Sequence, residues 1–498
     1  MASASRRHAL VLPLAAAALA APTLAALAMA AAATAARGQG GELERALAAA
    51  TESARRVAPA LGVHVLDLGS GATIWAWEPD RPRIVASNTK LITSAAALAR
   101  LGPGYLLETP LLTRGEVDGE TLDGDLAVVG GGDPLISGRR TGGDSLALFR
   151  QWGVALRELG IRRIAGDLVL VHGAFDDLVV HPDWPRDQLD AWYEAPVEAL
   201  SFSDNCVLVR VSAGPRPGTP AHVEVLPDVG AVEVSSSART VAGRPRSRAT
   251  IHRSPGSDVV VVRGEASLAE QPLEAWITVE DPVAYFGAAV RAGLEQAGVR
   301  VEGATSSSPG LEETGWTPVA VHRSDLLSVL DVMNQRSQNL FAESIFKLLG
   351  HELCGEGSWP SGRSAVEEFL RVDLGLPDGS YSLADGSGMS RENRFTPRQL
   401  TTLLAHMFGH RWSREFLRTL PYSGQEDLRW ERRLAEEPYR GNVFAKTGGL
   451  NGVSTLSGYS KARSGRLYAF SILCNETRSN GDAMRAQDAI VRALVDRG

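Results

Sequence analysis

The sequence predicts an α+β protein with a long β-rich insertion, on two observations. First, two short strands around a turn at residues 69–71 lead into an apolar-periodic helix, which favours α+β layers over a doubly wound parallel sheet. Second, residues 106–275 contain short Val- and Leu-rich runs between Gly, Pro and Ser clusters, whereas helical patterns return after this stretch.

Length, charge and the first residues bound the possibilities. The chain has 498 residues, enough for two or three domains, and its net charge of −7 argues against a nucleic-acid-binding surface. Arg6 and Arg7 precede an Ala- and Leu-rich run that extends to about Ala36. This layout predicts a secretory signal peptide over residues 1–36, or an N-terminal membrane anchor if the segment is not cleaved.

The three cysteines do not form a disulfide scaffold, because they are too few and too scattered. Cys474 lies in an apolar run and is predicted to be a buried free thiol. A single disulfide between Cys206 and Cys354 stays open at this point.

The elements before the insertion follow from periodicity. Residues 42–56 have an amphipathic helical pattern, and Leu61–Leu68 and Ala72–Trp77 are predicted strands. The next apolar-periodic run begins near Ser87 and continues to Leu101, which predicts a helix.

The insertion is predicted to contain one or two subdomains rich in strands. Gly130–Pro134 follows a strand but lacks the spacing of a phosphate-binding loop, so it is interpreted as a tight turn. The clearest predicted strands are Leu126–Val129, Asp167–Val171, Val207–Val211 and Val259–Val262.

The last third of the chain is mainly helical and closes with two strands and a helix. The predicted helices are Pro282–Ala297, Leu326–Leu349, Ser364–Leu374, Pro397–Phe408 and Asp482–Val495, and the predicted strands are Gly452–Tyr459 and Leu467–Leu473.

Ser87 and Lys90 form the first motif with chemical meaning. Positions i and i+3 of a helix share a face, so the Lys90 amine can reach the Ser87 hydroxyl. A serine hydroxyl becomes a good nucleophile when a base removes its proton, and a lysine is such a base where its pKa is lowered. The spacing is therefore that of Ser-x-x-Lys acyl transfer.

Lysine usage strengthens this interpretation. Arginine stays charged and cannot act as a base, and only four of the 51 basic residues are lysine. A lysine in this chain therefore tends to mark a site that needs an amine. The spacing alone is weak, because Ser344 and Lys347 repeat it.

Two further motifs follow. Ser337 and Asn339 stand at a helix start, where the hydroxyl can relay a proton and the amide can hold a substrate backbone, although both residue types also cap helices. Lys446-Thr447-Gly448 precedes a strand and can bind a carboxylate with a charge-assisted hydrogen bond. Residues 203–205 repeat the Ser-x-Asn pattern within the insertion and are interpreted as a turn.

In this order, the three motifs resemble those of the penicillin-recognising serine transferases, and within them the class C low-molecular-mass penicillin-binding proteins. These are D-alanyl-D-alanine carboxypeptidases and endopeptidases. The likeness extends over most of the chain beyond residue 42 and includes residues 124–134, 195–202 and 385–391. It implies a transpeptidase/β-lactamase-like domain, an antiparallel sheet with flanking helices, built from residues 42–105 and 276–498 and interrupted by the insertion at 106–275.

The resemblance also implies roles for site residues. Ser87 would be the nucleophile that forms an acyl-enzyme, Lys90 its base, and Ser337 the group that passes a proton to the leaving amine. The substrate-binding residues would be Asn339, Lys446, Thr447 and Gly449, with the backbone N–H groups of Ser87 and Gly449 as the oxyanion hole.

Gly449 departs from the family pattern, in which Thr or Ser usually follows Lys-Thr-Gly. The backbone donor is kept but a carboxylate-binding hydroxyl is lost. We therefore expect weaker selection for a free terminal D-alanine and a shift toward hydrolysis of cross-links.

Other enzyme classes fit less well. Residues 143–146 spell the start of a GDSL esterase, but such an enzyme needs a histidine near the C-terminus and none follows His410; Asp144 is instead expected to cap the helix that follows. His351 and His406 lack the partners of a zinc-protease motif. A β-lactamase would need an additional water-activating group, which the sequence does not identify.

The expected protein is thus an exported, periplasmic or cell-envelope serine peptidase that cleaves D-Ala-D-Ala or D-Ala-diaminopimelate bonds. Its expected partners are peptidoglycan stem peptides, with β-lactams as covalent inhibitors and an association with the membrane surface left open. No metal or cofactor is expected. The alternative is a non-catalytic peptidoglycan-binding protein that retains the fold.

Overall fold

The computed structural model describes residues 41–243, 246–311, 314–428 and 430–498. The predicted signal peptide or anchor at residues 1–36 lies outside the described residues. Within the described ranges, no helix has both the length and the apolar character needed to cross a membrane.

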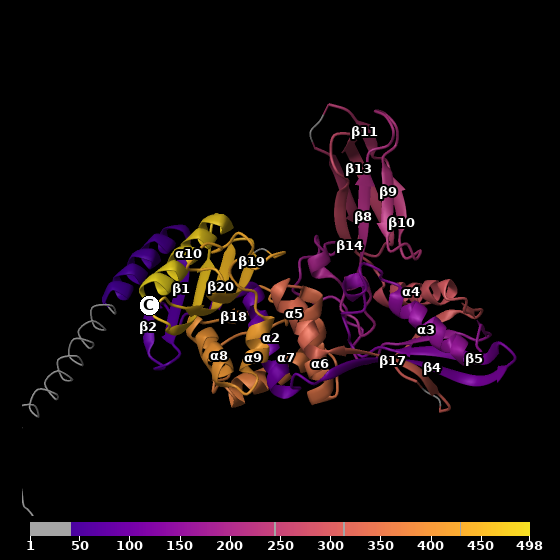
Figure 1. Ribbon diagram of the computed structural model, residues 1–498, viewed down its shortest axis with the longest axis horizontal. Coiled ribbons are helices and arrows are strands. Elements are labelled where there is room, and N and C mark those ends of the chain that lie inside the picture. The colour runs from indigo at the N-terminus through magenta and orange to yellow at the C-terminus, as the bar shows by residue number, and fades with distance from the viewer. Residues whose placement is uncertain (1–40, 244–245, 312–313, 429) are drawn as a thin grey trace, which may run out of the picture.

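One antiparallel sheet is built from both ends of the chain (Figure 1). Strand β1 lies between β2 and the C-terminal β21, and its pairing with β21 runs from Ala60 opposite Asn475 to Asp67 opposite Tyr468. The strand order is β19, β20, β21, β1 and β2, and the bounds are β1 Ala60–Asp67, β2 Thr73–Trp77, β19 Val443–Leu450, β20 Val453–Lys461 and β21 Leu467–Asn475.

Helices cover both faces of this sheet because its side chains alternate between two cores. Phe470 and Ile472 of β21 pack with the helix over residues 41–57 and with α10 (Asn480–Arg497), whereas Ala469 and Leu473 pack on the opposite side. That second core is formed with α2 from the first third of the chain and with helices nearer the C-terminus. Their bounds are α2 Thr89–Arg100, α5 Leu326–Gln335, α6 Asn339–Cys354, α7 Trp359–Val372, α8 Pro397–Gly409 and α9 Ser413–Thr419.

The helix predicted over Leu326–Leu349 is two helices in the structure. The chain breaks at Ser337, whose φ of 59° lies in the left-handed region, so α5 ends before it and α6 begins at Asn339. Both halves are apolar, and their periodicity alone does not reveal the break.

A seven-stranded sheet forms the body of the inserted region, with α3 (Ala147–Glu158) and α4 (Pro282–Gln296) packed against it. Phe149, Phe202 and Phe286 meet in an aromatic cluster in its core. Its strands are β4 Leu106–Asp118, β5 Thr121–Val129, β6 Arg163–Ile164, β7 Leu168–Val171, β15 Arg300–Val301, β16 Thr305–Ser308 and β17 Thr317–Asp325.

Two smaller sheets rise from this body as a projection (Figure 1). The three-stranded sheet has the order β14, β8 and β9, with β8 Cys206–Ser212, β9 His222–Leu226 and β14 Leu273–Thr278. The four-stranded sheet contains β10 Glu233–Ser236, β11 Arg239–Val241, β12 Arg248–Arg253 and β13 Val259–Ser267.

The inserted layer extends beyond the boundary expected at residue 275. Helix α4 packs against α3, β15 and β16 pair with β6 and β7, and β17 pairs with β4 along its length. The chain therefore leaves the seven-stranded sheet at Asp325, where α5 begins.

Two local expectations are also resolved. Cys206, Cys354 and Cys474 are all free thiols, so the disulfide left open by the sequence is not formed. Asp144 is not the residue that caps α3, because the N-cap is Leu146; Asp144 instead accepts a hydrogen bond from the Leu146 N–H and pairs with Arg150.

Candidate active site

Ser87 lies in a 3-10 turn (Ala86–Asn88) that leads directly into α2. Ala86 is buried and has a φ of 45°, a left-handed backbone conformation that residues other than glycine rarely adopt. Two hydrogen bonds hold the turn on the sheet: Asn88 Nδ2 donates to the Lys446 carbonyl at 2.9 Å, and Thr455 Oγ1 donates to the Val85 carbonyl at 2.9 Å. The serine is thereby fixed beside β19.

Lys90 directs its amine at Ser87 from one turn further along. Nζ lies 3.1 Å from Ser87 Oγ, and it donates to Asn339 Oδ1 at 2.7 Å and to the Ser387 carbonyl at 2.8 Å. The side chain is fully buried, and this burial lowers the pKa of Lys90 to about 7, against the opposing effect of the Glu343 and Asp385 carboxylates. A neutral amine beside a serine hydroxyl is what general-base activation requires.

The Ser337 loop places two polar groups near this pair. The hydroxyl of Ser337 accepts a hydrogen bond from Lys446 Nζ at 2.8 Å. Asn339 uses both ends of its amide, since Oδ1 accepts from Lys90 and Nδ2 donates to the Tyr193 carbonyl at 2.8 Å. Asn339 therefore connects the lysine to the inserted region.

Strand β19 forms the other wall of the site. A Cβ on Gly448 would lie 2.3 Å from Thr455 Oγ1 and 2.9 Å from the Ser87 nitrogen, so only glycine fits there. A Cβ on Gly449 would meet no atom within 4 Å. The missing hydroxyl at Gly449 therefore leaves open space at the edge of the strand.

These elements enclose a cleft of about 520 Å³. The sequence-predicted residues come together here: five line the cleft, and the two lysines bond to residues that line it. The lining includes Ser87, Ser337, Asn339, Thr447 and Gly449, together with Trp192, Tyr193, Arg336 and Met389.

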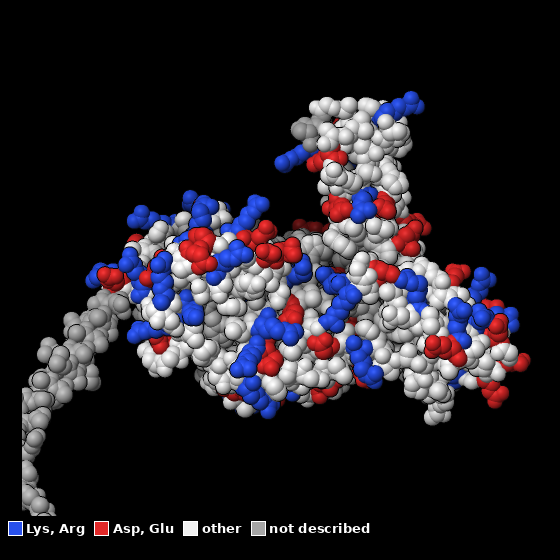
Figure 2. All heavy atoms as spheres, viewed as in Figure 1, with Lys and Arg blue, Asp and Glu red and all other residues white. Residues whose placement is uncertain are grey.

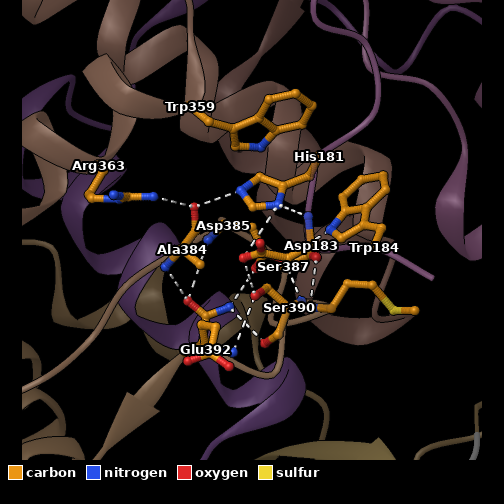
Figure 3. A network of polar contacts seen from close by, with 12 residues as sticks. His181, Asp183, Trp184, Trp359, Arg363, Ala384, Asp385, Ser387, Ser390 and Glu392 are labelled. Atoms are coloured by element: carbon orange, nitrogen blue, oxygen red, sulfur yellow. Dashed lines mark hydrogen bonds and ion pairs between the residues drawn. The ribbon is translucent and has the colours of Figure 1, made fainter. Parts of the chain in front are cut away.

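A loop over residues 384–393 supplies the carbonyl that holds Lys90, and two buried carboxylates hold the loop. Asp385 accepts N–H donors from Gly388, Ser390, Asn393 Nδ2 and Trp184 Nε1 (Figure 3). His181 Nε2 lies 3.2 Å from the Ala384 carbonyl in the same network. The inserted region thus holds the loop through His181 and Trp184.

Glu343 of α6 is the second carboxylate that holds the loop, and it was not identified from the sequence. Its Oε1 accepts the Ser387 N–H at 2.7 Å, and its Oε2 accepts the Gly386 N–H and Trp359 Nε1, each at 2.9 Å. Burial raises the pKa of Glu343. Its position four residues after Asn339, on the same face of α6, is the one signal that could have found it.

The other sequence motifs lie elsewhere. Lys347, the lysine of the second Ser-x-x-Lys match, donates to Asp176 Oδ1 at 2.7 Å and to the Leu178 carbonyl at 2.8 Å, away from Ser344. Residues 203–205 form a 3-10 turn. In the described part of the chain, no three His, Cys, Asp or Glu side chains are grouped as metal ligands.

A serine paired with a buried lysine, a Ser-x-Asn loop and a Lys-Thr-Gly strand around one cleft define a serine peptidase of the penicillin-recognising class. The comparisons agree with this class. The D-Ala-D-Ala carboxypeptidase 3 (S13) family of peptidases matches residues 43–496. The chain is 32% identical over 455 residues to the D-alanyl-D-alanine carboxypeptidase of Actinomadura sp. (strain R39), which covers 87% of this chain and 81% of that relative.

A further relative and a solved structure are also similar to this chain. The D-alanyl-D-alanine carboxypeptidase DacB of Haemophilus influenzae is 28% identical over 395 residues, with 77% and 79% of the two chains covered. The crystal structure of penicillin binding protein 4 from Haemophilus influenzae has the same fold, with a TM-score of 0.78 at 24% identity, over 89% of this chain and 99% of that one.

The chain therefore belongs to the D-Ala-D-Ala carboxypeptidase 3 (S13) family. It is a low-molecular-mass penicillin-binding protein and a serine-type D-alanyl-D-alanine peptidase, which confirms the predicted family, fold class and enzyme class. The non-catalytic alternative is not favoured by this assignment.

Proposed function

We propose that this enzyme cleaves D-Ala-D-Ala or D-Ala-diaminopimelate bonds in peptidoglycan stem peptides through an acyl-enzyme on Ser87, with Lys90 as the base. The observation that carries the proposal is the 3.1 Å contact between Lys90 Nζ and Ser87 Oγ at a fully buried lysine. Burial disfavours the ammonium form, so the amine can accept the hydroxyl proton as Oγ attacks the peptide carbonyl.

The other residues of the cleft are assigned to proton transfer, oxyanion stabilisation and substrate binding. Ser337 passes a proton to the leaving amine, and Lys446, hydrogen-bonded to Ser337, keeps that hydroxyl oriented. The backbone N–H groups of Ser87 and Gly449 stabilise the oxyanion, with a contribution of about 3 kcal/mol per donor. Asn339 holds the peptide, Lys446 and Thr447 bind the terminal carboxylate, and water then releases the acid.

The first test uses mass spectrometry after incubation with benzylpenicillin. We expect one covalent adduct that maps to the Ser87 peptide and is lost in Ser87→Ala, together with hydrolysis of a D-Ala-D-Ala peptide. Ser344→Ala is the matched control, because Ser344 has the same spacing to a lysine but is buried away from the cleft. An adduct that persists in Ser87→Ala would assign the nucleophile elsewhere.

The proposal includes a preference for cross-links. Gly449 supplies no hydroxyl to a terminal carboxylate, and an endopeptidase substrate does not end in a free D-alanine at the cleaved bond. We expect Gly449→Ser to raise the ratio of carboxypeptidase to endopeptidase activity several-fold, since a hydrogen bond to a charged group contributes about 1.5–3 kcal/mol.

The added side chain fits at this position, because a Cβ on Gly449 meets open space. Gly448→Ala is the contrasting variant: its Cβ would lie 2.3 Å from Thr455 Oγ1, so both activities should fall together. The preference idea fails if Gly449→Ser leaves the ratio of the two activities unchanged.

The proposed place of action is the cell envelope, because the substrate lies outside the cytoplasm and residues 1–36 have a signal-like pattern. Intact mass measurement of the protein recovered from the envelope fraction tests this. A mature chain that begins between residues 28 and 41 is expected for a cleaved signal, and full-length protein in the membrane fraction for an anchor. Full-length protein confined to the cytoplasm would contradict export.

A further inference from the structure

A second cavity, of about 890 Å³, lies beside the catalytic cleft. Trp192 and Arg336 line both cavities, so the two spaces adjoin at these side chains. Two sequence motifs that have no role in the catalytic cleft contribute to the lining of the second cavity. They are the GDSL-like stretch, through Asp144 and Ser145, and the second Ser-x-Asn pattern, through Ser203 and Asp204.

The wall between the cavities is the Ser337 loop. Arg336 immediately precedes Ser337, and the next side chain, Gln338, donates through Nε2 to Asp204 Oδ2 at 2.9 Å. Asp204 in turn pairs with Arg139. The loop that carries the proposed proton relay is therefore bonded directly to the wall of the second cavity.

One side of the cavity is apolar. Trp276, Leu208 and Leu226 stand opposite one another across β14, β8 and β9, so they form one row on one face of the three-stranded sheet. Trp276 is 49% exposed, which is unusual for a tryptophan in a sheet. An exposed aromatic in a concave site is a common anchor for a ligand.

The rest of the lining carries charges of both signs. The arginines are Arg139, Arg150 and Arg336, and the carboxylates are Asp144, Asp204 and Asp228. Figure 2 shows the same mixture of signs over the visible face of the inserted region. An apolar row beside charges of both signs suits a short peptide that has methyl groups, carboxylates and amines.

We propose that this cavity binds the leaving peptide strand of a cross-linked stem-peptide substrate, an inference that rests on the function proposed above. The leaving amine departs toward Ser337, and the residue before Ser337 already lines the second cavity. A leaving group of one D-alanine ends inside the cleft, whereas a second stem peptide continues past Arg336 onto the Trp276 row. Binding outside the reacting centre then selects cross-linked substrates.

The test compares two sugar-free synthetic substrates on the full mature enzyme: a cross-linked tetrapeptide dimer and a pentapeptide that ends in D-Ala-D-Ala. Trp276→Ala should lower kcat/KM for the dimer, relative to kcat/KM for the pentapeptide, by about tenfold, mainly through KM. Phe408→Ala is the matched control, because Phe408 is a 41% exposed aromatic that lines neither cavity, and it should leave the ratio unchanged.

A binding measurement supports the kinetics without turnover. Protein already acylated by benzylpenicillin has a blocked cleft, yet it should still bind the free tetrapeptide that leaves when the dimer is hydrolysed. Calorimetry measures this binding, and Trp276→Ala should weaken it. Leu208→Ala provides a second variant, since it shortens the same apolar row while Trp276 itself is kept.

The outcomes separate the inference from the function on which it rests. Equal losses for dimer and pentapeptide, or an effect of Trp276→Ala that appears only when the substrate carries its disaccharide, would overturn the leaving-strand site; the second result would indicate a glycan site. Absence of a penicillin adduct and of all hydrolysis in the unmodified enzyme would instead overturn the proposed function.

Discussion

Lys90 is a base only where its ammonium form is costly, and the structure sets two opposing influences on it. Burial lowers its pKa, whereas the carboxylates of Glu343 and Asp385 raise it. Within the described part of the chain, no hydrogen bond joins Glu343 to Lys90 directly. Glu343 accepts the Ser387 N–H, and the Ser387 carbonyl accepts from Lys90. Glu343 is therefore a positioning residue that also supplies charge.

This arrangement predicts the pH dependence of acylation. The proposed base, Lys90, can accept a proton only as the neutral amine, so the second-order rate of acylation by benzylpenicillin should rise with pH through about 7, where burial places its pKa. Glu343→Gln removes a negative charge that raises this pKa, so the rising limb should move to lower pH by about one unit. The amide also sets an NH₂ group against at least one N–H donor of the loop, so the acylation rate at high pH should fall as well. Stopped-flow acylation rates between pH 5 and 9 measure the shift.

The control for this variant is Glu352→Gln on the same helix, where the carboxylate accepts a hydrogen bond from the exposed Tyr105 hydroxyl. Its profile should coincide with that of the unmodified enzyme. If Glu343→Gln only lowered the rate and left the inflection in place, the charge would have no part in setting the Lys90 pKa, and Glu343 would be purely structural.

At the scale of elements, the loop over residues 384–393 depends on Asp385. Each of its carboxylate oxygens accepts two N–H donors, so an amide in its place would set an NH₂ group against two donors. We expect Asp385→Asn to lower the free energy of unfolding by about 3 kcal/mol. Acylation should also slow, because the Ser387 carbonyl would leave Lys90. Urea unfolding followed by fluorescence, with acylation rates, measures both effects.

Asp183→Asn is the matched change for this loop. The Asp183 carboxylate accepts a hydrogen bond from the Ser390 hydroxyl and lies 3.8 Å from His181 Nδ1, and its side chain is 42% exposed. An amide oxygen can therefore replace the carboxylate there at little cost. We expect a change within about 0.5 kcal/mol. Equal destabilisation by the two variants would contradict the bracing role of Asp385.

Periodicity predicted most elements of the catalytic part, because helices such as α8 have one buried and one exposed face, and strands such as β21 are continuous apolar runs that are buried on both faces. It did not predict the break at Ser337, since a single left-handed residue leaves the apolar pattern intact. The three motifs identified residues that meet at the cleft. Glu343 and the Ser387 carbonyl were missed because one is a buried carboxylate and the other a backbone atom, and both depend on contacts distant in sequence.

At the scale of the whole molecule, long-range pairing decides what sequence alone leaves open. The end of the inserted layer at Asp325 depends on β17 pairing with β4, some two hundred positions away, which no local pattern reports. The chain has separate hydrophobic cores: one holds the inserted sheets with α3 and α4, and others hold the helices on each face of the five-stranded sheet. We propose that the inserted region is a distinct folding unit.

A pair of matched core substitutions tests this proposal. Leu294 of α4 and Leu404 of α8 are both fully buried, one in the inserted core and one in the helical core of the catalytic part. Each Leu→Ala change should cost about 2–5 kcal/mol in its own core, because it removes buried methyl groups and leaves a cavity.

If the units unfold separately, calorimetry shows two transitions, and each variant lowers the temperature of a different one. Penicillin acylation, measured at 25 °C after heating, should then be lower for Leu294→Ala heated above the transition of the inserted unit than for Leu404→Ala heated to below the transition of the catalytic part. The reason is that Asn339 and the 384–393 loop rely on contacts from residues 181–193. A single transition that both variants lower equally would mean that the cleft and the insertion fold as one unit.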